Sequence, residues 1–278
     1  MKKLKRWFKR IYKILRLEEM QILPGQLAFF LVVSVFAMLP LIALIGSSFV
    51  TREFAQSLKD LPVGVASVFK DLLDTDSSGY NIFLFMAISL FFSSSGCKSI
   101  IVTSNVIYKI TENNKVKQGV KAFIMTIILM LIIVFTAVVP AFGDLVLGSI
   151  KAKYPGDVIN LIIKLFDILK YPLSFLLIFI GVKIIYTMAP DMTIKSKYTN
   201  RGALFTTLAW IIITRVYAIY LNNINTYNIF YGSLANVVIV LFWFYLLSYV
   251  FTMGMALNAN SYFDYLAEKR KKEEEKEQ

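Results

Sequence analysis

The chain has 278 residues, of which 57% are hydrophobic and 17% are charged, and its mean hydropathy is +0.64. A soluble domain carries about 25% charged residues, so this composition excludes an ordinary soluble protein and indicates an integral membrane protein. The formal net charge of +12 could suggest nucleic acid, but the basic residues gather at the ends of apolar segments, where membrane topology places them.

The absence of histidine limits the chemistry available to the chain. With no histidine and a single cysteine, Cys97, the sequence excludes Ser-His-Asp and Cys-His nucleophile systems, histidine metal ligands and an internal disulfide. No Walker sequence and no Gly-x-Ser-x-Gly motif occurs. We therefore expect no catalytic residue, no cofactor and no metal, and we predict that the protein is not an enzyme.

The first 26 residues are predicted to be a basic cytoplasmic segment. Residues 1–17 alternate eight lysines and arginines with aromatic and aliphatic side chains at helical spacing. This pattern is typical of an amphipathic helix that lies in the plane of an anionic membrane surface. Such a helix would serve either as a topological anchor or as a lipid sensor.

Six apolar stretches that could cross a bilayer follow. A hydrocarbon core of about 30 Å needs roughly 20 apolar residues in a helix. The expected spans are residues 27–50, 82–103, 122–147, 171–189, 203–221 and 234–258. They predict an all-α, polytopic membrane domain over residues 27–260 and a charged cytoplasmic tail over 261–278. Residues 157–170 are amphipathic and predict a separate outer helix, either packed on the bundle or covering a site.

The distribution of basic residues predicts the orientation of the spans. An even number of spans places both termini on one side of the membrane. Twenty of the lysines and arginines outside the spans then fall on that side, and seven fall on the other. The positive-inside rule therefore predicts that both termini lie in the cytoplasm.

Three basic residues lie within the predicted spans, namely Lys98, Lys183 and Arg215, and Asp144 is the one carboxylate at comparable depth. A charge near the bilayer centre costs roughly 2.5–3.5 kcal/mol, so its side chain usually faces protein, water or a ligand. The excess of positive charge therefore predicts a membrane interior suited to an anion.

Each of these charges also has a structural interpretation. Lys183 lies about 9 Å from the end of its span, so it either snorkels to the interface or binds a ligand. Lys98 adjoins Ser95 in a Ser-Ser-Ser-Gly run that would serve equally as a packing seam or as the wall of an anion site. Arg215 would pair with Asp144, contact an anionic ligand or snorkel.

Several blocks of sequence, spread over nearly the whole chain, match a known family. They are Leu27-Ala28-Phe29-Phe30, Ser95-Gly96 with Asn105 and Tyr108, Arg201-Gly202, Tyr227-Asn228, Tyr231-Gly232-Ser233-Leu234, Trp243-Phe244-Tyr245 and Gly254-Met255-Ala256-Leu257-Asn258-Ala259. In this order and spacing they resemble the YihY/BrkB family of bacterial inner-membrane proteins. The block that begins at Tyr231 is the most specific of them.

The resemblance implies a six-helix fold in the cytoplasmic membrane of a bacterium. Members of the family have been labelled ribonuclease BN, and they are also described as transporters, with lipid export as one suggested activity. The family has a glutamate where this chain has Ala256, so a mechanism that needs that carboxylate would not operate here. Asn258 remains as the polar residue of that block.

These observations predict a transporter of an anionic lipid or amphiphile, resembling a flippase or scramblase and lacking a nucleotide site. The candidate substrate-binding residues are Arg215, Lys98, Ser95, Lys183 and Asn258. The expected partners are anionic membrane lipids, and we expect no nucleic acid. The alternative function is a non-transporting membrane scaffold, or a partner of an envelope protein complex.

Overall fold

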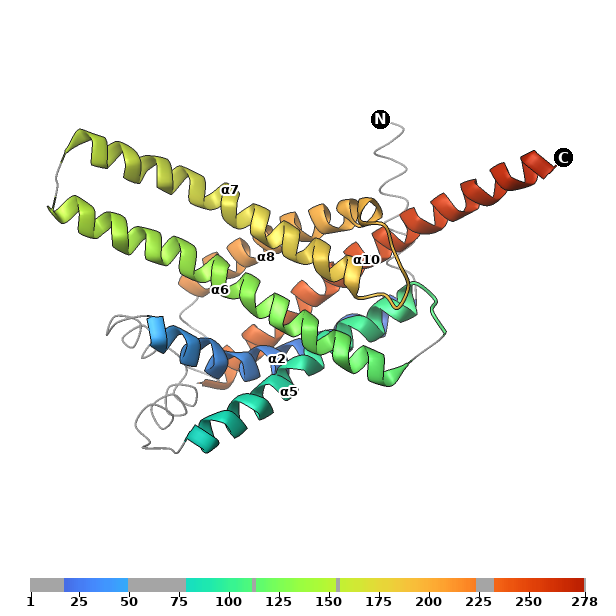
Figure 1. Cartoon of the computed structure of the whole chain (residues 1–278), viewed down its shortest axis with the longest axis horizontal. Helices are drawn as coiled ribbons and strands as arrows, with labels where there is room; N and C mark the ends of the chain where they lie inside the picture. The colour runs from blue at the N-terminus through green and yellow to red at the C-terminus, as the bar shows by residue number, and fades with distance from the viewer. Residues whose placement is uncertain (1–17, 50–78, 112–113, 154–155, 224–232, 278) are drawn as a thin grey trace.

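The computed structural model describes residues 18–49, 79–111, 114–153, 156–223 and 233–277, which form long helices and one short 3-10 turn (Figure 1). The helices are α2 (Glu19–Phe49), α5 (Gly79–Ile107), α6 (Lys115–Lys153), α7 (Asp157–Met188), α8 (Asn200–Asn223) and α10 (Ser233–Glu277), with the turn η2 at Ser196–Tyr198. The predicted amphipathic segment 1–17 lies outside the described residues.

Each of the six long helices covers most or all of one expected span and extends beyond it. Within the described residues, five of them are long and apolar enough to cross a membrane, and these are α2, α5, α7, α8 and α10. The sixth, α6, has 39 residues, and the side chains at 133–146 in its middle are outside the described part. The prediction of an all-α, polytopic membrane protein is confirmed.

The prediction of a separate helix at residues 157–170 is wrong. This segment and the fourth span form one continuous helix, α7, of 32 residues, with Pro172 inside it. At 1.5 Å per residue α7 is about 48 Å long, which exceeds the roughly 30 Å of a hydrocarbon core. The two segments join because the apolar stripe of the amphipathic part continues in phase into the span.

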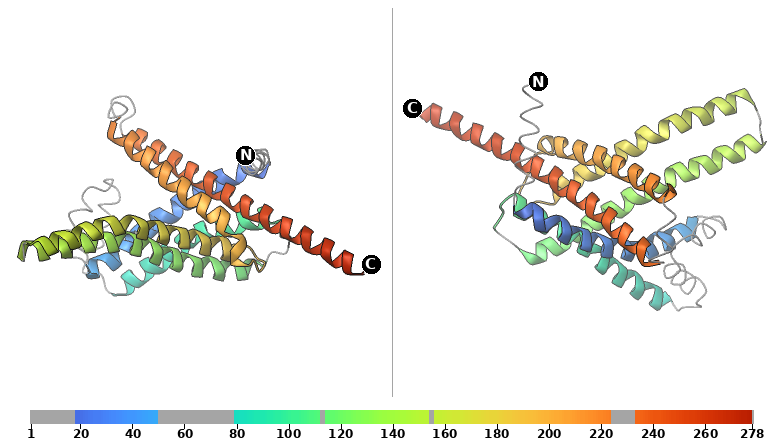
Figure 2. Two further views of the ribbon diagram at one scale, coloured as in Figure 1. Left: turned by 90° about the horizontal axis from the view of Figure 1, so that it is seen from above. Right: turned by 180° about the vertical axis from the view of Figure 1, so that it is seen from behind.

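The helices form a closed ring in chain order. Each helix packs on the next one, and α10 returns to pack on α2 as well as on α8. At one end of the ring the α6–α7 hairpin extends beyond the other helices, and we call this end the hairpin side (Figure 1). At the opposite end, the C-terminal side, the last part of α10 extends away from the ring (Figures 1 and 2).

Two glycines bring α8 and α10 together on the C-terminal side. A Cβ atom added at Gly202 would overlap the carbonyl oxygen of Gly254, and one added at Gly254 would overlap the hydroxyl of Thr206. The backbone N–H of Gly202 donates a hydrogen bond of 2.8 Å to Oδ1 of Asn258, which is fully buried. Small residues at such a crossing let two helix backbones approach closely in a membrane.

A tyrosine from α7 joins the same crossing. The hydroxyl of Tyr186 donates to the carbonyl oxygen of Phe251 and shares a hydrogen bond with the hydroxyl of Thr206, each at 2.7 Å. The ring of Phe251 lies between those of Tyr186 and Trp210, at centroid distances of 4.7 and 5.8 Å. The indole N–H of Trp210 donates to the carbonyl oxygen of Leu247 at 2.9 Å. These contacts hold α7, α8 and α10 as one unit.

The crossing predicts a difference between two glycine substitutions. Gly254→Ala is expected to destabilise the protein by about 1–3 kcal/mol, because its methyl group has no space against backbone and hydroxyl atoms. Gly119→Ala in α6 is the matched control, since an added Cβ there meets nothing within 4 Å. The control should be neutral, or more stable by about 0.5–1 kcal/mol. Thermal unfolding in detergent measures both, and equal melting temperatures for the two variants would contradict the proposed close approach.

Candidate functional site

The polar groups buried inside the ring are uncharged. Fifteen polar side chains are buried in the described part of the chain, and all of them are serine, threonine, asparagine or glutamine. Neutral groups of this kind are far less costly to bury in a membrane protein than a charge. An interior lined by cations, which the sequence suggested, is therefore not found among the described residues.

Lys98 lies on the outward face of α5. It is exposed, and Phe91 (73% exposed) and Ile88 (48% exposed) share its face of the helix. Ser95, one turn before Lys98 on the same face, is partly exposed, and its hydroxyl donates to the carbonyl oxygen of Phe92 at 2.6 Å. On this outward face, Lys98 lies about 14 Å and Ser95 about 18 Å from the end of α5 at Ile107.

The Ser-Ser-Ser-Gly run is divided between two faces of α5. Ser93 and Gly96 face α2, where the hydroxyl of Ser34 donates to the carbonyl oxygen of Ser93. A Cβ atom added at Gly96 would lie 2.6 Å from the Cβ of Ser34, so this part of the run is a packing seam. Ser94 and Ser95 are partly exposed on the other side of the helix. The packing interpretation therefore describes Ser93 and Gly96, and an anion site at Ser94 and Ser95 stays a prediction.

Arg215 lies on the outward face of α8. It is exposed, and it shares this face with Ile212, Val216 and Ile219, which are 60–62% exposed. It is eight residues before the end of α8 at Asn223, or about 12 Å, which places it in the half of the ring nearer the hairpin side. The expected pair with Asp144 falls outside the described side chains.

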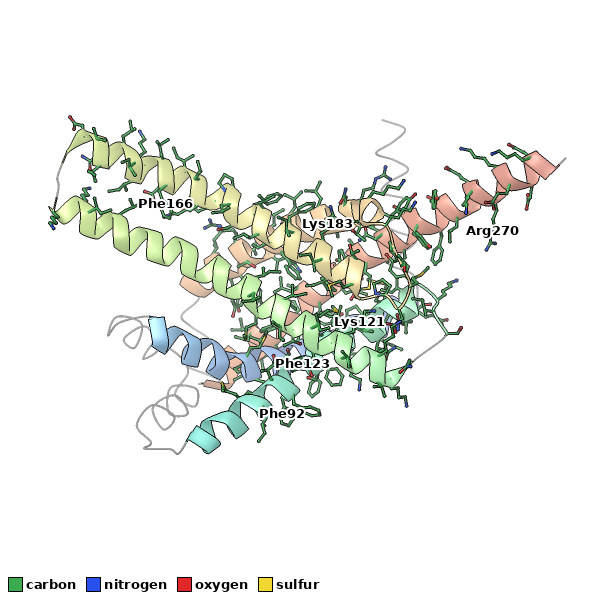
Figure 3. The ribbon with its side chains drawn as sticks, viewed as in Figure 1. Phe92, Lys121, Phe123, Phe166, Lys183 and Arg270 are labelled. Carbon is green, nitrogen blue, oxygen red and sulfur yellow. The ribbon has the colours of Figure 1, made fainter. Side chains whose placement is uncertain are left out.

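The remaining predicted residues have different surroundings. Lys183 is half-buried on α7 (Figure 3), whereas Asn258 is fully buried at the α8–α10 crossing. The amide Nδ2 of Asn258 has no hydrogen-bond partner among the described residues. The structure therefore does not bring these residues to one site. Lys98 lies on the outward face of α5 and Arg215 on that of α8, and these two helices do not pack on each other. Asn258 lies within the core.

The family block near the start of the sixth span is only partly visible. Tyr227, Tyr231 and Gly232 lie outside the described residues, and Ser233 is the first residue of α10. Trp243 stacks on Tyr217 of α8, with 5.2 Å between ring centroids and an interplanar angle of 21°. This contact agrees with a packing role for Trp243.

A polar cluster on the C-terminal side was not predicted. Asp191, in the loop after α7, accepts hydrogen bonds at Oδ2 from Asn105 of α5 (2.6 Å) and from Gln118 of α6 (2.7 Å). Its other oxygen, Oδ1, forms an ion pair with Lys121 of α6, whose Nζ donates a hydrogen bond to it at 2.7 Å. The ammonium of Lys121 also donates to the carbonyl oxygens of Ala189 and Pro190. We call this the Asp191 cluster (Lys121 is labelled in Figure 3).

The electrostatics of the Asp191 cluster favour the charged carboxylate. Burial of Asp191 raises its pKa, but the hydrogen bonds from Lys121, Gln118 and Asn105 outweigh this effect and hold the pKa below its usual value. The backbone N–H of Asp191 also donates to Oδ1 of Asn105 at 2.9 Å. Because the side-chain oxygens of Asp191 are already bonded, the cluster acts as a clamp between α5, α6 and α7 rather than as a ligand site.

The sequence carried a partial signal for this cluster. Asn105 belongs to a family block, but Asp191 and Gln118 have no distinguishing local pattern, and Lys121 resembles any basic residue at a helix end. Only the packing of three helices brings the four side chains together. In the described ranges, no three His, Cys, Asp or Glu side chains gather in an arrangement that could hold a metal.

Comparison with known proteins gives one family and a few relatives. The family model described as "Virulence factor BrkB" matches residues 12–278. The chain is 26% identical over 209 residues to "Putative ribonuclease-like protein YfkH" of Bacillus subtilis (strain 168), covering 75% of this chain and 73% of that protein. No solved structure matches.

Two shorter matches are to proteins described only as membrane proteins. The chain is 29% identical over 80 residues to "UPF0761 membrane protein PSHAa0171" of Pseudoalteromonas translucida (strain TAC 125), covering 29% of this chain and 27% of that protein. It is 26% identical over 87 residues to a "UPF0761 membrane protein" of Verminephrobacter eiseniae (strain EF01-2), covering 31% and 21%. These two matches span less than a third of each relative.

The Asp191 cluster predicts a pH-dependent contribution to stability. Asp191→Asn should destabilise the protein at neutral pH by about 1–3 kcal/mol, because an amide cannot accept bonds from all three donors. Since the pKa of Asp191 is lowered in the folded state, this stability is present above the unfolded pKa of about 4 and is lost as the pH falls through the folded pKa. The difference between wild type and variant should therefore be largest at neutral pH and shrink in acid.

Thermal unfolding at pH 7 and at pH 3 measures this difference. Glu273→Gln is the matched control, since Glu273 makes an ion pair of 3.4 Å with Lys269 in which both side chains are more than half exposed. An exposed pair of this kind contributes little to stability. An Asp191→Asn protein as stable as wild type at pH 7 would rule out the clamp.

Proposed function

The chain belongs to the family described as virulence factor BrkB, and we propose that it moves an anionic lipid or amphiphile across the cytoplasmic membrane, with no nucleotide site of its own. The family match and the apolar helices make it a multi-pass membrane protein. The lipid substrate and the transport activity are the proposal. A hydrolase is disfavoured because the sequence contains no histidine and no nucleophile motif.

The observation that carries the proposal is the placement of two cations on the lipid-facing surface. Lys98 on α5 and Arg215 on α8 are both exposed among apolar side chains, in opposite halves of the ring. A charged side chain in contact with hydrocarbon is costly, and an anionic headgroup drawn to it would offset that cost. Arginine presents a forked set of donors that suits phosphate, and lysine provides a point charge.

The proposed path follows the outside of the ring. Because α5 and α8 lie on opposite sides of the ring, a phosphate headgroup leaving the inner leaflet would meet Lys98, and one leaving the outer leaflet would meet Arg215. Its acyl chains would stay in the surrounding lipid, so only the headgroup needs polar contacts. The hydroxyls of Ser94 and Ser95 beside Lys98 would add such contacts near the middle of α5. The interior of the ring, whose buried polar groups are neutral, would serve as a rigid support.

The orientation of the chain is part of the proposal. With both termini in the cytoplasm, Lys98 lies in the inner half of the membrane and Arg215 in the outer half. The basic loops and the charged end of α10 would then face the anionic inner surface, which attracts lysine and arginine. This orientation is supported by the excess of basic residues on the side of the termini.

The alternative is a scaffold that recruits an envelope protein without transporting lipid. Two features favour it: the α6–α7 hairpin and the end of α10 extend beyond the ring on opposite sides (Figure 2). Such extensions are accessible to partners on both sides of a membrane. A scaffold would tolerate loss of the lipid-facing cations but not loss of the extensions, so the two functions make opposite predictions for the same variants.

Removal of the two cations tests transport. The double variant Lys98→Ala, Arg215→Ala is expected to move a fluorescent phosphatidylglycerol analogue at least about tenfold more slowly in reconstituted vesicles. The loss of one charge-assisted contact of about 1.5–3 kcal/mol accounts for a factor of this size. Dithionite quenching of the outer leaflet measures the rate of lipid movement.

Two controls separate this result from misfolding and from a general effect of charge. Lys164→Ala removes one exposed lysine from the hairpin side and should transport at the wild-type rate. The exchange variant Lys98→Arg, Arg215→Lys keeps both charges and should retain most of the activity. Equal rates for the double alanine variant and wild type would refute the proposed path.

A further inference from the structure

The face of α7 that packs on α8 becomes exposed toward the hairpin side. On this face Tyr186 is 1% exposed and shares a hydrogen bond with Thr206 of α8. Phe179 and Phe175, about two and three turns before Tyr186, are partly exposed, and Ile168, five turns before it, is 57% exposed. The exposure of this face therefore rises with distance from the C-terminal side.

The opposing face of α8 changes in the same way. Ala203 lies in the buried core together with Tyr186 of α7, and Thr207, one turn further along α8, is also fully buried. Thr214 and Ala218, seven and eleven residues after Thr207, continue this face of the helix and are exposed. Both helices thus lose their buried surface in the same direction.

The exposed parts of the two faces lie at the same height. The hydroxyls of Thr187 and Thr199 are 3.2 Å apart, and they bring the end of α7 next to the start of α8. At 1.5 Å per residue, Ile168 lies about 30 Å from that end of α7, and Ala218 lies about 27 Å from that start of α8. These exposed side chains therefore belong to one level of the bundle.

The loss of contact leaves an opening between two pairs of helices. At this level α8 remains on α10, where Tyr217 stacks on Trp243, and α7 remains beside α6 (Figure 1). In both views of Figure 2 the α6–α7 pair and the α8–α10 pair diverge toward the hairpin side. We define the α7–α8 opening by its exposed lining residues, which are Ile168 and Pro172 of α7 and Thr214 and Ala218 of α8.

The α7–α8 opening lies at the depth of lipid tails. Both helices are long and apolar enough to cross a membrane. The lining residues are about 21–30 Å from the ends of the two helices on the C-terminal side, within a hydrocarbon core of about 30 Å. At this depth hydrocarbon chains and not water surround a protein, so an acyl chain is the occupant that the surroundings supply.

Two cations flank the opening. Arg215 directly follows Thr214, is exposed, and lies about 22 Å from the start of α8. Lys183 is half-buried on α7, three residues before Tyr186, near the closed end of the boundary. A charge at membrane depth is costly unless a partner of opposite sign meets it, and the guanidinium of arginine suits a phosphate. The charge beside the opening therefore favours an anionic lipid over a neutral one.

We propose that the α7–α8 opening binds one phospholipid of the leaflet on the hairpin side, with its phosphate at Arg215 and an acyl chain between α7 and α8. The chain lies against Ile168 and Pro172 and reaches toward the partly exposed Phe175. This inference rests on the proposed function and deepens it, because it places the lipid that meets Arg215 between two named helices.

Quenching by labelled lipids tests this site through binding and not through movement. In a background with Cys97→Ala, Ile168→Cys carries a bimane fluorophore, and the protein is reconstituted with nitroxide-labelled phosphatidylglycerol or phosphatidylcholine. Phosphatidylglycerol is expected to quench the fluorophore several-fold more strongly than phosphatidylcholine. Phe36→Cys on α2 is the matched control, since it is exposed and lies about 26 Å from the start of its helix. There the two lipids should quench equally.

Arg215→Ala assigns the selectivity to the headgroup contact. In this variant the excess quenching by phosphatidylglycerol at Ile168→Cys should disappear, while quenching by phosphatidylcholine persists. Equal quenching by the two lipids in the wild-type background, no quenching at position 168, or an excess that survives Arg215→Ala would each overturn the site. Selective quenching without lipid movement would refute transport and keep the site, whereas movement without selective quenching would refute the site alone.

Discussion

The arrangement of the bundle depends on the close approach of α8 and α10 at Gly202 and Gly254. In lipid the hydrophobic effect does not draw helices together, so their association relies on packing and on hydrogen bonds between them. The glycines let the backbones approach, the amide of Asn258 caps the N–H of Gly202, and Tyr186 extends the contact to α7. With α10 also packed on α2, this crossing closes the ring and fixes which face of each helix points outward.

Neutral and charged polar side chains occupy different places in the ring. The polar side chains buried in the described part are neutral, and many bond within their own helix, as Thr126, Thr207 and Thr252 do to carbonyl oxygens four residues earlier. Of the three membrane-depth cations, Lys98 and Arg215 are instead on the outward face, and Lys183 is half-buried. A cation on this face retains access to headgroups, whereas the same charge in the core would need a buried counter-ion. Among the described residues, the buried polar side chains are thus neutral, and the exposed membrane-depth cations lie outside the core.

The sequence predicted where the helices lie in the chain, but it did not predict which face of each helix points toward its neighbours. Apolar length predicts six spans because a helix must cross the hydrocarbon whatever its neighbours are, and all six were found as helices. The boundary between residues 157–170 and the fourth span was misjudged, since a proline and flanking charges resemble a break, although the helix continues through Pro172. The Asp191 cluster could not be predicted, because it joins side chains from three separate segments. Hydropathy also does not say whether Lys98 faces inward, since that depends on which helices become its neighbours.

The two outward cations belong to different parts of the ring. Lys98 is on α5, which packs mainly on α2 and α6, whereas Arg215 is on α8, which packs on α7 and α10. Because these two helices share no main neighbour, a change at one cation leaves the packing around the other intact. The headgroup contacts proposed at Lys98 and at Arg215 are therefore physically separate, and in the proposed orientation each is reached from its own leaflet.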